Sequence, residues 1–132
     1  MSEHGRPRHA PWFGLGPMML AKPGATHMHD HLMRHSADAS AILAAMANER
    51  RLRILCLLIE AEHSVGALAD KVELSQSALS QHLAKLRALN IVSTRRQGQT
   101  IYYSFACADS GKILEMLDGL YGQKSAALCA AE

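Results

Sequence analysis

No stretch of this sequence is apolar for long enough to cross a lipid bilayer. The longest apolar runs, such as Ile54–Ile59, are far shorter than the ~20 residues that a membrane-spanning helix requires. The start of the chain, Met1–Gly5, also lacks the basic-then-apolar order of a secretory signal. We therefore expect a cytoplasmic protein, and its 132 residues leave room for a single domain with a modest core.

Cysteine is scarce and irregularly spaced. The chain has 3 cysteines, Cys56, Cys107 and Cys129, and none of them belongs to a CxxC pair. This pattern argues against a disulfide scaffold and against a structural zinc knuckle. No glycine-rich phosphate loop or HExxH motif occurs either. We predict that the protein is not an enzyme and that it carries no cofactor.

Acidic residues are missing from one long segment, although the whole chain has a net charge of only +2. Residues 74–108 include no Asp or Glu, whereas they include Lys85, Arg87, Arg95 and Arg96. Local basicity of this kind favours contact with phosphates even when the chain as a whole is nearly neutral.

Regular hydrophobic periodicity is missing from the first part of the chain. Residues 1–36 contain all 4 prolines, several glycines and most of the 8 histidines. We therefore interpret residues 1–36 as a disordered His/Pro/Gly-rich arm. Residues 37–122 are expected to form the folded domain, and residues 123–132 a flexible tail.

Helical periodicity begins after the arm. Residues 39–46 are rich in Ala, Leu and Met and predict a short helix, and Asn48 is the expected N-cap of a second helix of about three turns. Ser64 is expected to cap a short third helix. Ser75 is expected to cap a fourth helix, which runs to about Leu89.

After the fourth helix the periodicity changes from helical to about two. Residues 91–94 and 100–105 are rich in β-branched and aromatic side chains, and Gly98 lies at the expected tip of a hairpin between them. A last helix follows, with a wide apolar arc: Ile113, Leu114, Leu117, Leu120 and Tyr121. The predicted fold is mainly α with a β-hairpin wing, a winged helix-turn-helix with the order α-α-α-α-β-β-α.

The fourth predicted helix has two different faces. Leu79, Leu83 and Leu86 form an apolar stripe that would attach the helix to the domain. The opposite side has short polar and basic side chains: Ser75, Gln76, Ser77, Ser80, Gln81, His82 and Lys85. Glutamine amides pair with adenine, and hydroxyl and imidazole groups contact bases or phosphates, so this face is typical of a helix that enters the major groove. A solvated polar face capped by Ser75 is the alternative interpretation.

The hairpin supplies a second basic surface. Arg95, Arg96 and Gln99 lie near its expected tip, where guanidinium groups can bind phosphates or enter a minor groove. Arginine also prevents edge-to-edge pairing of strands, which is the alternative explanation. The polar helix and the basic hairpin together favour double-stranded DNA as the partner. A constitutive regulator, and a winged helix that binds only proteins, remain as alternatives.

Five segments carry a more specific pattern: residues 46–52 (MANERRL), 64–69 (SVGALA), 74–83 (LSQSALSQHL), 94–96 (TRR) and 99–103 (QTIYY). Together they resemble the ArsR family of bacterial winged-helix repressors, over nearly all of the predicted domain. Within that family the resemblance is greatest to the group that contains NolR and the sulfur-responsive BigR, SqrR and HlyU. It implies a homodimer, joined through the first and last helices, that represses transcription at a pseudo-palindromic operator.

The resemblance also implies roles for individual residues. Bases and phosphates would be contacted by Gln76, Ser77, Ser80, Gln81 and His82, and the wing would use Arg95, Arg96 and Gln99. A twofold dimer fits the physics of recognition, because two helices read half-sites about one helical turn, ~34 Å, apart. The wide apolar arc of the last helix is expected to pair with its copy in that dimer.

The sequence lacks the two metal sites that are common in this family. The third predicted helix has no cysteine, and the last one has no histidine. By the resemblance, Cys56 occupies the place of one reactive cysteine of the sulfur-responsive group, but the expected partner position holds Gly122. Cys107 and Cys129 are alternative partners, so a thiol-responsive repressor released from DNA on oxidation or sulfide exposure is an alternative function. An inert thiol in an apolar helix is the competing interpretation of Cys56.

A histidine cluster in the arm is the second candidate sensor. His27, His29, His31 and His35 lie close together, and imidazole suits nickel, copper or zinc. A metal-responsive repressor is therefore a further alternative. A disordered arm supplies no fixed geometry, so adventitious metal binding is the competing interpretation.

Overall fold

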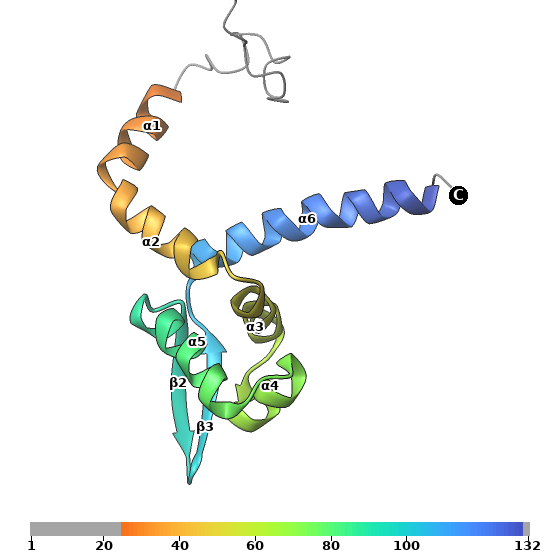
Figure 1. The fold of residues 1–132 in the computed structure, drawn as a ribbon. Helices are drawn as coiled ribbons and strands as arrows, with labels where there is room; N and C mark the ends of the chain where they lie inside the picture. Colours follow the sequence, from red (N-terminus) through yellow and green to blue (C-terminus); the bar gives the residue numbers. More distant parts are fainter. Residues whose placement is uncertain (1–24, 131–132) are drawn as a thin grey trace, which may run out of the picture. The chain divides into compact units, whose positions relative to one another are not determined.

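The computed structural model describes residues 25–130, and the side chains of residues 30–124. It divides the chain into two units, residues 1–39 and residues 40–132, which are described separately. In the first unit, α1 (Ala25–Arg34) is followed by the start of α2 (Ser36–Met46) (Figure 1). Among the described residues, no helix is both long and apolar enough to span a membrane.

The structure has a helix at residues 25–34, whereas the sequence predicted a disordered arm as far as residue 36, and the bounds of that arm stay a prediction. All 4 prolines precede Ala25, and so does every glycine of the arm. The helical segment after Gly24 contains no proline or glycine, and half of its 10 residues are Ala, Met, Leu or Arg, which favour helix. The composition of the whole arm therefore concealed a segment without helix breakers, and the predicted disorder of residues 1–24 lies outside the described residues.

Three helices of the second unit begin directly after their predicted N-cap residues. Asn48 accepts a hydrogen bond from the amide of Arg51 and precedes α3 (Glu49–Glu60). Ser64 precedes α4 (Val65–Val72), and Ser75 precedes α5 (Gln76–Ala88), each with its side chain accepting from the backbone amide three residues on. Each cap stabilises its helix by about 1 kcal/mol, because it satisfies an amide that has no partner inside the helix.

A tight turn joins α4 to α5. Glu73 caps the end of α4 in the left-handed conformation, with φ 55°, and the amide of Leu74 donates to the carbonyl of Ala69. This conformation costs a residue with a Cβ atom about 1 kcal/mol or more, so the contacts around it must maintain the turn. The result is the predicted helix-turn-helix.

A small antiparallel sheet completes the second unit. It consists of β1 (His63–Ser64), β2 (Val92–Gln97) and β3 (Thr100–Phe105), in the order β1-β3-β2. We call the β2–β3 hairpin the wing. Its register pairs Val92 with Phe105 and Gln97 with Thr100, and Gly98 lies at the tip with φ 64°, as expected. The strand β1 was not predicted, because two residues are too few to produce a periodicity.

The core lies between α3, α4, α5 and one face of the sheet. Its fully buried side chains are Ile54, Leu55, Leu68, Val72, Leu79, Leu83, Leu86 and Ile91. Tyr103 and Phe105 of β3 pack against this cluster. The leucine stripe of α5 is thus buried as predicted, which fixes the direction in which the polar side of that helix points.

The last helix, α6 (Ala108–Ala130), extends away from α3, α4 and α5 (Figure 1). Helix continues through Ala130, beyond residue 123, where the sequence predicted the start of a flexible tail; the flexibility of that segment stays a prediction. The segment 123–130 contains neither proline nor glycine, so nothing in it ends the helix. Leu114 is buried at the start of α6, whereas Met116, Leu120 and Tyr121 are exposed.

Candidate nucleic-acid interface

The polar face of α5 is open to solvent. Six of the seven side chains predicted to meet DNA on this helix are exposed: Ser75, Gln76, Ser77, Ser80, Gln81 and Lys85. His82 is half-buried. Because Leu79, Leu83 and Leu86 are anchored in the core, this row of amides, hydroxyls and one ammonium group is held on a fixed helix surface.

A groove runs between α5 and the wing. Its volume is about 470 Å³, and its walls come from the start of α4, the start of α5 and β3. It brings together Gln76 and Ser80 of α5 with Gln99 at the wing tip, and Ile101 and Tyr103 form the wall on the side of the wing. Two amides and a hydroxyl group in one groove offer both donors and acceptors, which suits a phosphate backbone or the edges of bases.

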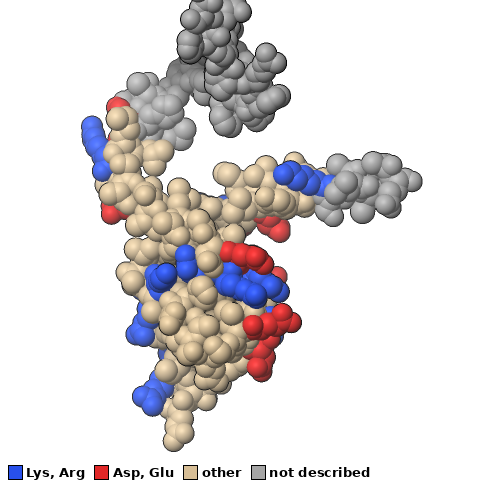
Figure 2. All heavy atoms as spheres, viewed as in Figure 1, with Lys and Arg blue, Asp and Glu red and all other residues tan. Residues whose placement is uncertain are grey.

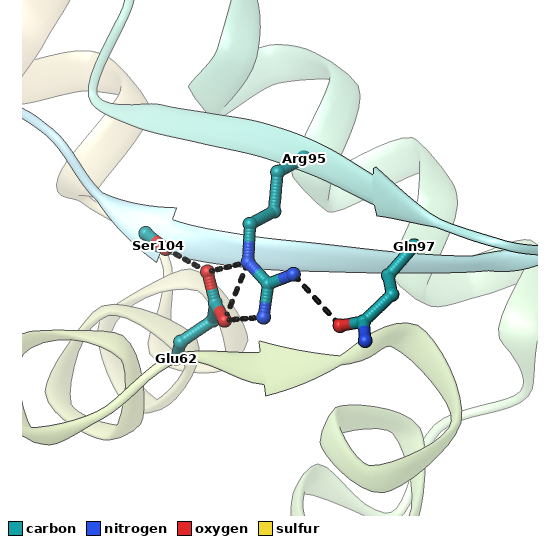
Figure 3. A network of polar contacts seen from close by, with 4 residues as sticks. All are labelled: Glu62, Arg95, Gln97 and Ser104. Carbon is teal, nitrogen blue, oxygen red and sulfur yellow. Dashed lines mark hydrogen bonds and ion pairs between the residues drawn. The ribbon is translucent and has the colours of Figure 1, made fainter.

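The two wing arginines lie on opposite faces of the hairpin. Arg96 pairs across the strands with Ile101, and its Nε donates to the carbonyl of Gly98 at 3.1 Å, next to the tip. Arg95 pairs with Tyr102, and its guanidinium is bound to Glu62 (Figure 3). The two guanidinium groups therefore do not share a face, because successive side chains of a strand point in opposite directions.

Glu62 could not be singled out from the sequence. It precedes the segment without acidic residues and lies 33 positions before Arg95 in the chain, so no local pattern connects the two. The pKa of the Glu62 carboxyl is lowered below its ordinary value, mainly by the hydrogen bonds from Arg95 and to a smaller extent by the one from Ser104. The same ion pair raises the pKa of Arg95.

Charge is unevenly distributed over the surface of residues 40–124. Figure 2 has Lys and Arg side chains over α3, along α5 and beside the wing, whereas the Asp and Glu side chains gather near α3 and α4. The polar side of α5 is thus bordered by cations, which attract a polyanion.

A buried arginine supports α5 from behind. Arg51 is only 8% exposed; its Nε and Nη2 donate to the carbonyls of Ala45 and Ala44, and its Nη1 lies 3.4 Å from Nδ1 of His82. Because a guanidinium can only donate, Nδ1 of His82 accepts and the other ring nitrogen carries the hydrogen. Burial lowers the pKa of His82, and the charges of Arg51, Lys85 and Arg50 lower it further. These contacts favour the neutral form of the His82 imidazole.

The two cysteines with described side chains are both free thiols. Cys56 of α3 is exposed, and its pKa is raised by partial burial and by the nearby Asp118 and Glu60. Cys107 is half-buried before α6, where Oγ and the amide of Ser110 lie 3.1 and 3.4 Å from its sulfur and lower its pKa. The surroundings thus favour the thiol form at Cys56 and the thiolate form at Cys107.

The histidine cluster is only partly described. His31 and His35 are exposed, and His27 and His29 belong to α1 but have side chains outside the described ones. Among the residues that the structure describes, no three His, Cys, Asp or Glu side chains are arranged to bind a metal ion. Metal binding by the four histidines stays a prediction.

Comparison with known proteins gives consistent matches. The sequence model of the bacterial regulatory proteins of the arsR family matches residues 48–94. The transcriptional activator HlyU of Vibrio cholerae is 48% identical over 76% of this chain and 93% of that protein. The nodulation protein NolR of Rhizobium meliloti is 58% identical over 68% and 74% of the two chains. A biofilm growth-associated repressor of Agrobacterium fabrum is 33% identical over 67% and 75%.

Solved structures resemble the fold as well as the sequence. Reduced HlyU from Vibrio cholerae superposes with a TM-score of 0.65 at 49% identity, over 69% of this chain and 96% of that one. The homodimeric winged helix-turn-helix DNA-binding domain of Mb0332 from Mycobacterium bovis gives a TM-score of 0.64 at 27% identity, over 72% and 88% of the two chains.

Proposed function

This chain belongs to the ArsR family of DNA-binding transcriptional regulators, and on that premise we propose that it is a homodimeric repressor of a pseudo-palindromic operator. The observation that carries the proposal is the groove in which Gln76, Ser80 and Gln99 meet, next to an exposed polar helix and a basic wing. Regulators of this class act by binding DNA rather than by catalysis, and the groove has the matching chemistry.

In this proposal α5 enters the major groove. The amides of Gln76 and Gln81 pair with adenine edges, while the hydroxyl groups of Ser77 and Ser80 and the N–H of His82 contact bases or phosphates. Lys85 at the far end of the helix contacts the backbone of the DNA. The Ser75 side chain is occupied by its capping bond to the amide of Ala78, so its contribution is to fix the start of the helix.

The wing contributes through its tip. Arg96 and Gln99 lie beside Gly98, where the hairpin is narrow enough to approach a minor groove or the phosphates that border it. A guanidinium group there adds affinity that depends on salt but not on sequence, because a phosphate carries no sequence information.

The homodimer is supported by the surface of α6. Met116, Leu120 and Tyr121 have exposed fractions of 69%, 51% and 65%, and Ile59 of α3 and Leu43 of α2 are exposed as well. Burying such side chains against a second copy removes apolar surface from water at about 25 cal/mol per Å². Two copies related by a twofold axis place two α5 helices on half-sites ~34 Å apart, which a single copy cannot do.

Repression follows from occupancy of the promoter. Among the relatives, HlyU is named an activator and the biofilm growth-associated protein a repressor. Transcription measured with and without the protein therefore decides between the two effects. We infer repression because a dimer bound across two half-sites covers the DNA that a polymerase needs.

The experiment is a titration of purified protein against its own upstream DNA and a scrambled copy, at two salt concentrations, followed by transcription in vitro from the same promoter. We expect selective binding that weakens with salt, and less transcript as protein is added. Equal affinity for the scrambled DNA would overturn specific recognition, and more transcript would overturn repression.

A thiol response is the second candidate function, favoured by the hydrogen bonds between Ser110 and Cys107. We propose that oxidation or a polysulfide modifies Cys107 or Cys56 and releases the DNA. Titrations with reduced, polysulfide-treated and nickel- or copper-loaded protein, on wild type and on Cys56→Ser and Cys107→Ser, test it. Release by polysulfide that disappears in Cys107→Ser is the expected result. Release by metal alone would favour the histidine cluster, and no release in any sample would indicate a constitutive regulator.

A further inference from the structure

One carboxylate ties the wing to the helical part of the domain. Glu62 lies in the connection between α3 and β1, and Arg95 lies in β2, on the other edge of the sheet. Glu62 accepts hydrogen bonds from Nε of Arg95 at 2.8 and 2.9 Å, and from Oγ of Ser104 in β3 at 2.9 Å (Figure 3). The connection before β1, the middle strand and the outer strand therefore meet at a single side chain.

The guanidinium of Arg95 contacts three side chains. Besides the bidentate contact with Glu62, its Nη1 donates to Oε1 of Gln97 at 3.0 Å. Its plane lies over the ring of Tyr102, 4.4 Å from the centroid. A bidentate ion pair with a stacked ring fixes the orientation of an arginine far better than a single contact does.

Arg95 also points away from the groove. Ile101 and Tyr103 of β3 form the groove wall, and Arg96 shares their face of the hairpin because it pairs with Ile101. Arg95 shares the opposite face with Tyr102 and Ser104. A residue that neutralises a phosphate needs a free charge directed at the DNA, and of the two arginines Arg96 has this geometry.

The wing needs such an attachment. Its outer half, from Arg95 to Ile101, is exposed on both strands, and β1 contributes only 2 residues to the sheet. A two-stranded hairpin without a third strand is marginally stable in water. A tip that is mobile in the free protein becomes ordered when it binds DNA. The conformational entropy lost in this step reduces the affinity.

We propose that Glu62 and Arg95 are positioning residues, which fasten the wing to the α3–β1 connection and so fix the distance between its tip and α5. Arg96 then supplies the phosphate contact of the wing. The inference rests on the proposed function, since it assigns the wing a task in binding DNA.

The test titrates four variants against the operator over a tenfold range of salt. Three of them, Glu62→Gln, Arg95→Gln and the double variant of these two, are compared with the fourth, Arg96→Gln. Each of the first two variants is expected to weaken binding by about two- to fivefold, the range of an exposed ion pair. The double variant should be no weaker than either single one. The slope of log K against log salt should stay unchanged in all three, whereas Arg96→Gln should reduce it by about 0.9.

Several results of these titrations would overturn the proposal. A slope reduced by about 0.9 in Arg95→Gln would make Arg95 a phosphate contact. Tighter binding by Glu62→Gln would mean that the carboxylate competes with DNA for Arg95. The exchanged pair, Glu62→Arg with Arg95→Glu, should recover most of the lost affinity, and failure to do so would count against the attachment.

Hydrogen exchange separates this inference from the function on which it rests. Amides of the wing should exchange faster in Glu62→Gln and Arg95→Gln than in wild type, with those of α5 unchanged, whether or not DNA is present. Wild-type protein that did not select its operator would overturn the proposed function and the role of the wing in it. Unchanged exchange in the wing would overturn the attachment itself.

Discussion

Gln76 is an exposed side chain that also lines the groove. It lies at the start of α5 and lines the groove together with Gln99. If its amide reads an adenine, Gln76→Ala should cost about 1–3 kcal/mol at the operator and relax the preference at one base pair. Binding to a set of operator variants measures this. Lys85→Ala is the control, because loss of a phosphate contact weakens all sequences alike; a Gln76→Ala protein with unchanged preference would exclude base reading.

His82 gives the free protein a pH dependence. Its pKa lies below the ordinary value of 6.5 in the folded protein, so the unfolded chain takes up a proton first as the pH falls. The free energy of unfolding should therefore be fully maintained above pH 6.5 and decrease below it, until the pKa of the folded state is passed. Urea denaturation of wild type and His82→Gln between neutral and mildly acidic pH measures the difference. If the decrease persisted in His82→Gln but vanished in His35→Gln, the pH dependence would come from His35 and not from His82.

At the scale of the element, the cap of α5 can be tested separately from its DNA contacts. Ser75→Ala removes the acceptor for the amide of Ala78 and should lower the free energy of unfolding by about 1 kcal/mol. Ser80→Ala is the matched control, since Ser80 is an exposed hydroxyl residue of the same helix. Chemical denaturation distinguishes them, and equal losses in the two variants would remove the cap as the cause.

Elements that depend on local rules were predictable from the sequence. The caps at Asn48, Ser64 and Ser75 follow from one side chain and one amide three residues on, and the hairpin tip follows from Gly98. In contrast, β1 depends on a partner strand that is distant in the chain. The helix α1 was obscured by its neighbours, because composition averaged over the arm gave weight to prolines that all precede it.

In the candidate site, too, features set by local sequence could be predicted, whereas features set by distant parts of the chain could not. The polar face of α5 could be predicted, because helical periodicity places its leucines on one side and its amides on the other. The direction of Arg95 could not be predicted without the register of β2 and β3, since a shift of one residue would exchange the faces of Arg95 and Arg96. Contact with Glu62 requires the tertiary fold.

For the whole molecule, the exposed apolar side chains of α6 predict the state of assembly. Leu120→Asp combined with Met116→Asp places charges where a second copy would pack, and should convert a dimer to a monomer. Operator affinity should then fall by about a hundredfold, because the second half-site no longer adds to the first. Sedimentation and DNA titration measure both effects. Glu115→Gln, a change at an exposed polar position of α6, is the control, and a Leu120→Asp, Met116→Asp protein that remained dimeric would place the interface elsewhere.

Arg51 contacts both α2, which the proposal places in the dimer interface, and α5, which the proposal places in the major groove. Its guanidinium bonds both the carbonyl of Ala45 near the end of α2 and the ring of His82 in α5. Moving one helix without the other would leave a buried donor unpaired, at about 1–3 kcal/mol. In the proposed dimer, a shift of α2 against the second copy would therefore be passed on to α5, the helix proposed to read DNA. A change at the pairing surface would then alter how strongly the protein binds DNA without altering which promoters it recognises.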